Sequence, residues 1–132
     1  MPALRVKTES RIISVLVVED SALIRERLCR MLSAKDGVHV VGEAAGVHEA
    51  LRLFAACQPD AVVLDLQLPD GCGIDVLRKI KRDAPGCVVV VLTSHSGKEW
   101  RAACLDLGAD HFLEKAREFE RLGETLTQLR NS

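Results

Sequence analysis

The strongest constraint on the fold is a fivefold alternation between apolar runs of strand length and segments of helical periodicity. The runs are short and rich in Val, Leu and Ile, and they lie at about residues 12–18, 38–44, 60–65, 87–92 and 110–113. Each run is followed by apolar residues at helical spacing, within residues 24–32, 47–55, 74–81, 100–107 and 119–129. Strands that alternate with helices in this way predict a parallel sheet covered by helices on both faces.

Five strand–helix units use almost all of the 132 residues, so we expect one domain over residues 11–132. Units of this length fit a doubly wound, five-stranded parallel sheet in the order 2-1-3-4-5, the flavodoxin-like (βα)5 form of the α/β class. The run at 38–44 is less apolar than the others, which favours an edge strand. Residues 1–10 are polar and aperiodic, and we expect a short flexible N-terminal extension there.

Composition excludes several classes of function. A formal net charge of −1 provides no broad basic field for nucleic acid or an anionic membrane. Aromatic residues make up 3% of the chain, too few for a platform that stacks bases. No apolar stretch approaches the ~20 residues of a membrane span, and the N-terminus lacks the apolar run of a signal peptide. We therefore expect a cytoplasmic protein that binds neither membrane nor DNA directly.

The cysteines do not form a recognisable redox or metal pattern. They are Cys29, Cys57, Cys72, Cys87 and Cys104. Their number is odd, no two form a Cys-x-x-Cys pair, and no His lies near them at zinc-like spacing. In a reduced cytosolic protein we expect most of these thiols to serve as small apolar fillers.

Chemically active side chains follow four of the five predicted strands. Glu19 and Asp20 follow the first strand, Asp65 the third, Thr93 the fourth and Lys115 the fifth. Parallel strands end at one edge of a sheet, where open α/β sheets place their sites, so these side chains should share a pocket. Three crowded carboxylates require a cation among them, and hard oxygen ligands suit Mg²⁺, which commonly pairs with phosphate.

An Asp in such a pocket can act as a nucleophile and form an aspartyl phosphate. Mg²⁺ and Lys115 would offset the charge of the phosphoryl oxygens, and the Thr93 hydroxyl could hydrogen-bond to one of them. Taken singly, each residue has a simpler interpretation: Asp65 and Thr93 as helix caps, Glu19 and Asp20 as a solvated strand end, Lys115 as an exposed side chain. The convergence of four strand ends favours the functional interpretation.

The segments that carry these groups resemble the motifs of response regulator receiver domains. They are Val18-Glu-Asp-Ser21, Val63-Leu-Asp-Leu-Gln-Leu-Pro-Asp-Gly71, Leu92-Thr-Ser94 and Phe112-Leu-Glu-Lys115. The resemblance extends from about residue 12 to the C-terminus. It implies a bacterial two-component or phosphorelay protein, to which a sensor histidine kinase or a histidine phosphotransfer protein passes a phosphoryl group.

The resemblance implies that Asp65 is the phospho-acceptor and that four residues bind Mg²⁺ or Mn²⁺. Asp20 and Asp65 would be direct ligands, and Glu19 would contribute through water. The backbone carbonyl of Gln67 matches the family's third protein ligand.

It also implies the residues that respond to phosphorylation. Thr93 and Lys115 match the pair that contacts the phosphoryl group, and Thr93 and Phe112 match the switch pair. Gln67 and His95 occupy the positions that tune dephosphorylation. Phe112 could instead be an ordinary core residue, and His95 a simple exposed loop residue.

Three positions depart from the family's pattern. Ala116 replaces the Pro that usually follows the lysine, so a cis bond is not expected there and the geometry of the loop is open. The acidic pair is Glu-Asp rather than the commoner Asp-Asp, and Phe112 lacks the hydroxyl of the frequent Tyr. The helical spacing of Trp100 and Ala103 favours side chains that face the core. The alternative is that Trp100 faces a protein partner.

The predicted function is a single-domain response regulator that is no enzyme beyond its own phosphorylation and dephosphorylation. It would switch its binding to a downstream protein through the face formed by the helix of residues 100–107, the strand of residues 110–113 and the helix of residues 119–129. One alternative is a phosphorelay intermediate or phosphate sink. A remote alternative is an Asp-nucleophile phosphatase, whose usual second Asp is replaced here by Gln67. No helix-turn-helix segment for DNA binding is evident.

Overall fold

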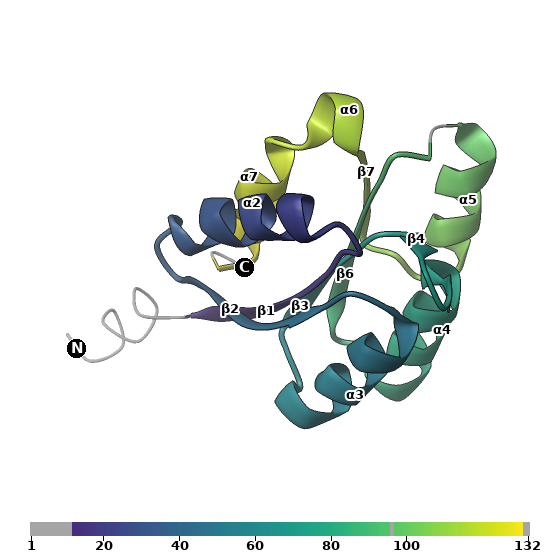
Figure 1. Cartoon of the computed structure of the whole chain (residues 1–132), viewed down its shortest axis with the longest axis horizontal. Coiled ribbons are helices and arrows are strands. Elements are labelled where there is room, and N and C mark those ends of the chain that lie inside the picture. The colour runs from purple at the N-terminus through teal and green to yellow at the C-terminus, as the bar shows by residue number, and fades with distance from the viewer. Residues whose placement is uncertain (1–11, 96, 131–132) are drawn as a thin grey trace.

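The apolar runs form the strands of one parallel sheet in the computed structural model, which describes residues 12–95 and 97–130. In chain order these strands are β1 (Ile13–Val18), β2 (Val38–Ala44), β3 (Ala61–Leu64), β6 (Val88–Thr93) and β7 (His111–Glu114). They lie in the order β2-β1-β3-β6-β7 and all pair in parallel, which confirms the predicted doubly wound order (Figure 1). The expected extension at residues 1–10 lies outside the described residues.

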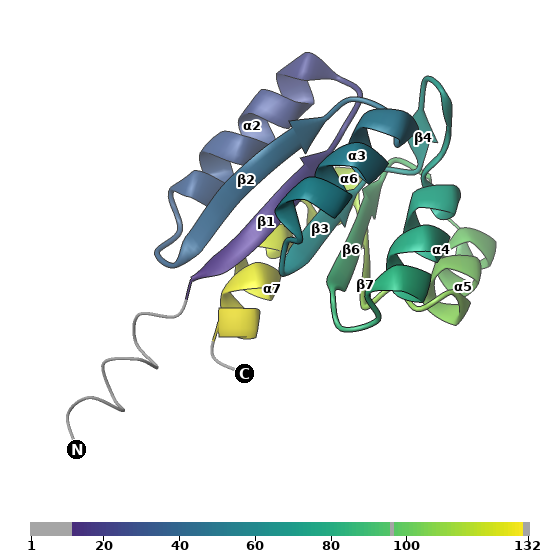
Figure 2. The same cartoon turned by 90° about the horizontal axis from the view of Figure 1, so that it is seen from below.

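Helices connect the strands on both faces of the sheet. They are α2 (Ala22–Ser33), α3 (Val47–Cys57), α4 (Gly73–Asp83), α5 (Lys98–Asp106), α6 (Lys115–Glu118) and α7 (Arg121–Arg130). Figures 1 and 2 show α2 and α7 on one side of the sheet and α3, α4 and α5 on the other. The sequence pattern predicted one final helix, whereas the structure has a short α6 before α7.

Alternation of side chains along the strands divides the core into two layers. In β1, Leu16 and Val18 belong to the layer that includes Phe54 of α3, while Val15 and Val17 belong to the layer with Leu28 of α2. Both faces of the central strands are covered, so near-continuous apolar runs are required there. β2 is an edge strand with alternating burial, as its weaker run predicted.

Two local features differ from the expectation. The loop after β3 holds a hairpin of β4 (Gln67–Leu68) and β5 (Gly71–Cys72), whose strands are too short to give a periodic signal. On α5, Ala103 was predicted to face the core but is exposed. The helix packs along Trp100, Cys104 and Leu107, so residue 103 falls at the margin of the buried stripe.

The five cysteines are free thiols. Cys87 and Cys104 are buried in the core, and Cys29, Cys57 and Cys72 are half-buried. Burial raises the pKa of Cys87 to about 11, so the thiol is protonated near neutral pH. No helix in the described part of the chain is long and apolar enough to cross a membrane.

Candidate functional site

The buried polar or charged side chains of the described residues are Glu19, Asp65 and Thr93, and all three lie at the carboxyl ends of strands. Glu19 directly follows β1, Asp65 directly follows β3, and Thr93 ends β6. The Asp65 N–H donates to the Val18 carbonyl at 3.0 Å, and the Glu19 N–H donates to the Ala44 carbonyl at 2.9 Å. Sheet hydrogen bonds therefore continue past the strand ends and fix the two carboxylates at one edge.

The Lys115 ammonium lies between the two buried carboxylates. Its Nζ is 2.6 Å from Glu19 Oε1 and 2.8 Å from Asp65 Oδ2, and its side chain is 13% exposed. Burial by itself would lower the pKa of Lys115, but the hydrogen bond to Asp65 and the negative charges of Asp65 and Glu19 outweigh it and raise that pKa. Lys115 is therefore a fixed positive charge beside Asp65.

Some oxygens of this cluster lack good hydrogen-bond donors. Glu19 Oε2 accepts from the Ser21 N–H at 2.9 Å, whereas the buried Oε1 has the close ion-pair contact with Lys115 but no well-aligned hydrogen bond. Asp65 Oδ1 accepts a long bond, 3.3 Å, from the Gln67 N–H. Buried carboxylate oxygens whose hydrogen bonds are missing or long fit a hard divalent cation such as Mg²⁺.

Asp20 does not join Glu19 and Asp65 in this conformation. Its side chain is exposed, whereas that of Glu19 is buried. Within residues 12–95 and 97–130, no three Asp, Glu, His or Cys side chains converge as a metal-binding group. The proposed ligand roles of Asp20 and of the Gln67 carbonyl remain predictions.

The loops after β3 and β6 contact each other beside the cluster. The Thr93 hydroxyl oxygen accepts the His95 N–H at 3.2 Å, and the Ser94 hydroxyl contacts the Gln67 side-chain oxygen at 3.4 Å. The His95 ring stacks on Trp100, with ring centroids 4.4 Å apart and an angle of 12° between the planes. Thr93 thus contacts His95, Gln67 contacts the intervening Ser94, and His95 is joined to α5 through Trp100.

Phe112 lies inward, under the surface of α5. The ring is 3% exposed and belongs to the core layer shared with α3, α4 and α5. The Arg101 guanidinium sits 5.1 Å from the centre of the Phe112 ring and 3.6 Å from the Glu118 carboxylate. The expected switch position is therefore buried in this conformation and covered by a cation of α5.

Asp70 has a structural role that the sequence did not indicate. Its Oδ1 accepts the Val47 N–H at 2.6 Å, and its Oδ2 accepts the His48 N–H at 3.1 Å. These two backbone donors hold the pKa of Asp70 below its usual range. Asp70 therefore caps α3 from the loop after Asp65, across a separation of 23 residues.

Gly73 is a second residue that the sequence did not single out. It begins α4, and its N–H donates to the Leu66 carbonyl at 2.9 Å. A Cβ at this position would collide with the Asp65 carbonyl oxygen and lie 2.9 Å from the Leu66 Cα. Glycine is thus required where α4 packs against the backbone that carries Asp65.

We expect Gly73→Ala to lower the free energy of unfolding by about 1–3 kcal/mol, because the added methyl group overpacks a rigid backbone. Gly86→Ala is the matched control, since a Cβ there has open space. Urea unfolding of both variants measures the difference. Equal stability of Gly73→Ala and the wild type would show that the 65–66 backbone can move aside.

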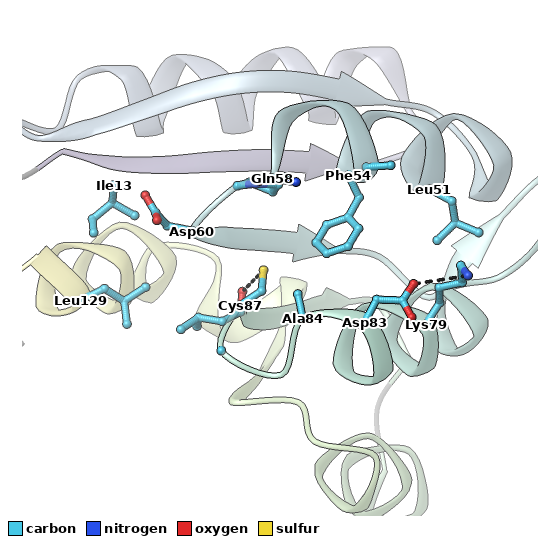
Figure 3. A pocket seen from close by; sticks show the side chains of 14 residues that line it. Ile13, Leu51, Phe54, Gln58, Asp60, Lys79, Asp83, Ala84, Cys87 and Leu129 are labelled. Atoms are coloured by element: carbon cyan, nitrogen blue, oxygen red, sulfur yellow. Dashed lines mark hydrogen bonds and ion pairs between the residues drawn. The ribbon is translucent and has the colours of Figure 1, made fainter.

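A hollow of about 800 Å³ lies at the amino ends of the strands, at the other end of the sheet from Asp65 (Figure 3). Ile13, Asp60 and Val88 line it from the amino ends of β1, β3 and β6. The Asp60 carboxylate already accepts the Ser14 N–H and hydroxyl, at 2.8 and 3.0 Å. This hollow is therefore separate from the acidic cluster around Asp65.

The remaining departure from the family's pattern concerns the loop after β7. No peptide bond among the described residues is cis, and the bond between Lys115 and Ala116 is trans. The chain enters α6 directly at Lys115. With Ala116 in place of Pro, the Lys115 ammonium still contacts the Asp65 carboxylate.

The fold and this cluster coincide with a known family. The family model of the response regulator receiver domain matches residues 15–127, and the chain belongs to that family. Its members act in bacterial two-component systems, and this chain has the receiver part of a response regulator.

Curated relatives are similar over this part only. The uncharacterized transcriptional regulatory protein YhcZ of Bacillus subtilis is 34% identical over 111 residues, which cover 84% of this chain and 52% of that protein. A protein-glutamate methylesterase/protein-glutamine glutaminase of Geobacillus kaustophilus is 40% identical over 104 residues, covering 78% of this chain and 30% of that protein. The chain thus spans about half or less of the length of these relatives.

Solved receiver domains share the fold closely. The signal receiver domain of the putative response regulator NarL from Mycobacterium tuberculosis has a TM-score of 0.84 at 28% identity, covering 92% of this chain and 98% of that one. The response regulator domain of Thermotoga maritima CheB has a TM-score of 0.80 at 28% identity, covering 91% and 94%.

Proposed function

We propose that Asp65 of this receiver accepts a phosphoryl group from a histidine kinase or a phosphotransfer protein and that the modification changes the binding of a protein partner. The observation that carries the proposal is the pairing of a buried Asp65 carboxylate with the Lys115 ammonium at the carboxyl edge of the sheet. Lys115 holds Asp65 Oδ2, so we assign Oδ1 as the nucleophile. That oxygen forms the new O–P bond while the P–N bond of the donor phosphohistidine breaks and the imidazole leaves with the electron pair.

Asp20, Asp65 and the Gln67 carbonyl would hold a Mg²⁺ or Mn²⁺ ion, with Glu19 acting through water. The ion supplies positive charge for the phosphoryl oxygens. Lys115 donates hydrogen bonds to the same oxygens from a position that the two carboxylates already fix. The oxygen-rich edge around Asp65 supports this assignment.

Thr93 is suited to respond to the new phosphoryl group. Its hydroxyl oxygen accepts the His95 N–H, so its own proton remains available for a phosphoryl oxygen. Movement of Thr93 would disturb His95 and the Trp100 ring stacked on it. Together with Phe112 beneath Arg101, this gives a two-state element on the α5–β7 surface that a charge-bearing modification can bias.

The proposal also includes one upstream and one downstream protein partner. The upstream partner carries phosphohistidine, and the downstream partner binds the face of α5, β7 and α7. That the chain works as a single-domain regulator stays a prediction, since the matched residues cover only 52% and 30% of the two curated relatives described above.

Incubation of the purified chain with acetyl phosphate tests the chemistry. With Mg²⁺ we expect an acyl phosphate that hydroxylamine removes, and we expect EDTA to abolish the labelling, because the ion offsets charge on the phosphoryl oxygens. Phosphate-affinity electrophoresis measures the labelled fraction. Labelling that is indifferent to EDTA, or absent with Mg²⁺, would contradict the proposed function.

A further inference from the structure

Arg25 is a half-buried cation of α2 that contacts the segment carrying the acidic pair. Its Nη1 donates to the Glu19 carbonyl at 2.8 Å and to the Asp20 carbonyl at 3.4 Å. Its Nε lies 3.4 Å from the Glu43 carboxylate near the end of β2, and the side chain is 22% exposed. Because α2 lies alongside β2 (Figure 2), Arg25 ties the turn after β1 to the edge strand of the sheet.

The dipole of α2 disfavours a cation at the place where Arg25 stands. Arg25 lies in the first turn of that helix, near the end that carries partial positive charge. Side chains of a helix lean toward its N-terminus, so the guanidinium reaches back past Ser21 to the two carbonyls. Its hydrogen bonds therefore serve the segment in front of α2 rather than the helix itself.

The two carbonyls that Arg25 holds belong to the peptide groups on either side of the Asp20 α-carbon. Peptide groups are planar, so the backbone at Asp20 has two free rotations, φ and ψ. A fixed Glu19 carbonyl limits the first rotation, and a fixed Asp20 carbonyl limits the second. Arg25 therefore restrains the direction in which the backbone presents the Asp20 side chain.

We propose that Arg25 is a positioning residue for the divalent-ion site: it fixes the backbone from which the exposed Asp20 carboxylate turns to bind an ion beside Asp65. The inference rests on the proposed function, because it takes Asp20 as a ligand of Mg²⁺ or Mn²⁺. Groups outside the ligand shell commonly set metal affinity, since they orient the ligands. Arg25 acts in this way through the backbone, and Glu43 holds its guanidinium in place.

Mn²⁺ binding to the full chain, measured by isothermal titration calorimetry without a phosphoryl donor, tests the inference. In Arg25→Met we expect the affinity to fall roughly tenfold, because the peptide groups beside Asp20 lose their donor. Charge alone predicts the opposite result: a guanidinium near the site repels a divalent ion, so its removal should tighten binding. Unchanged or tighter binding in Arg25→Met overturns the inference.

Arg30→Met is the matched control. It removes an exposed cation from the same helix, where Arg30 pairs with Glu26 at 2.6 Å. The control should bind Mn²⁺ like the wild type. A loss equal to that of Arg25→Met would assign the effect to the net charge of α2 and overturn the inference.

Labelling by acetyl phosphate gives a second readout that a purely structural role would not change. Arg25→Met should need roughly tenfold more Mg²⁺ for half-maximal labelling. It should reach the wild-type rate once Mg²⁺ saturates, because Asp65 and Lys115 are intact. A lower saturated rate with an unchanged Mg²⁺ requirement would place Arg25 elsewhere in the reaction and overturn the inference.

Arg25→Lys decides the question if a thermal melt shows that Arg25→Met is unfolded. Lysine keeps a positive charge for Glu43 but lacks the planar fork that reaches the carboxylate and both carbonyls together. We expect a roughly threefold loss of Mn²⁺ affinity, and wild-type affinity overturns the inference. If the wild type is labelled on Asp65 and every variant binds Mn²⁺ as it does, the inference alone is refuted. A wild type that is never labelled refutes the proposed function and the inference with it.

Discussion

Asp65→Asn is expected to reduce phosphoryl labelling by acetyl phosphate to the level of an untreated sample. The amide keeps the size of the carboxylate but is not a nucleophile, so the O–P bond cannot form. The fold should survive, because Lys115 keeps its contact with Glu19 at 2.6 Å. Phosphate-affinity electrophoresis measures the label, and the thermal melt confirms that the variant is folded.

Asp75→Asn is the control for Asp65→Asn. Asp75 is an exposed aspartate in the first turn of α4, and its carboxylate is 3.8 Å from Arg78. Its variant should be labelled at the wild-type rate. If Asp65→Asn were labelled as fast as Asp75→Asn, the phosphoryl group would belong to another residue.

Most of the fold could be predicted because the relevant information is local. The runs of Val and Leu in β1, β3 and β6 fill strands that are buried on both faces, and helical stripes cover them. Topology then supplies the site: in a parallel sheet, residues such as Glu19, Asp65 and Thr93 must arrive at one edge whatever the loops do.

Contacts between distant segments could not be predicted. Nothing near Asp70 indicates that it caps α3, since its donors, the N–H groups of Val47 and His48, lie over 20 residues away. The need for Gly73 appears only once α4 is packed against the Asp65 backbone. The stack of His95 on Trp100 likewise depends on how α5 is placed after its loop.

The expectation that Glu19 and Asp20 both share a pocket with Asp65 was too simple. Three carboxylates were expected to crowd together, but Glu19 is buried whereas Asp20 is exposed. The charge beside Glu19 and Asp65 comes from Lys115, a residue of the chain itself. This arrangement makes Lys115 important for stability as well as for chemistry.

Lys115→Met is expected to lower the free energy of unfolding by about 3–5 kcal/mol at neutral pH, because it leaves two buried carboxylates without their cation. Glu19 and Asp65 are 3% and 5% exposed, so water screens their repulsion poorly. Exposed Lys79→Met, which removes a 3.3 Å pair with Asp83, should cost less than about 1 kcal/mol. Urea unfolding followed by circular dichroism compares the two variants.

The pH dependence separates lost charge from lost packing. The pKa of Lys115 is raised in the folded state, so its stabilisation is complete below its unfolded pKa near 10.5 and disappears as the pH rises through the folded pKa. The deficit of Lys115→Met should therefore shrink as the pH rises through the folded pKa of Lys115, where the wild type loses the same charge. Millimolar Mg²⁺ should also restore part of the stability, because it binds the folded variant preferentially. A deficit that is constant with pH and Mg²⁺ would mean that Lys115 acts through the packing of its aliphatic stem, and would remove the electrostatic basis for its role beside Asp65.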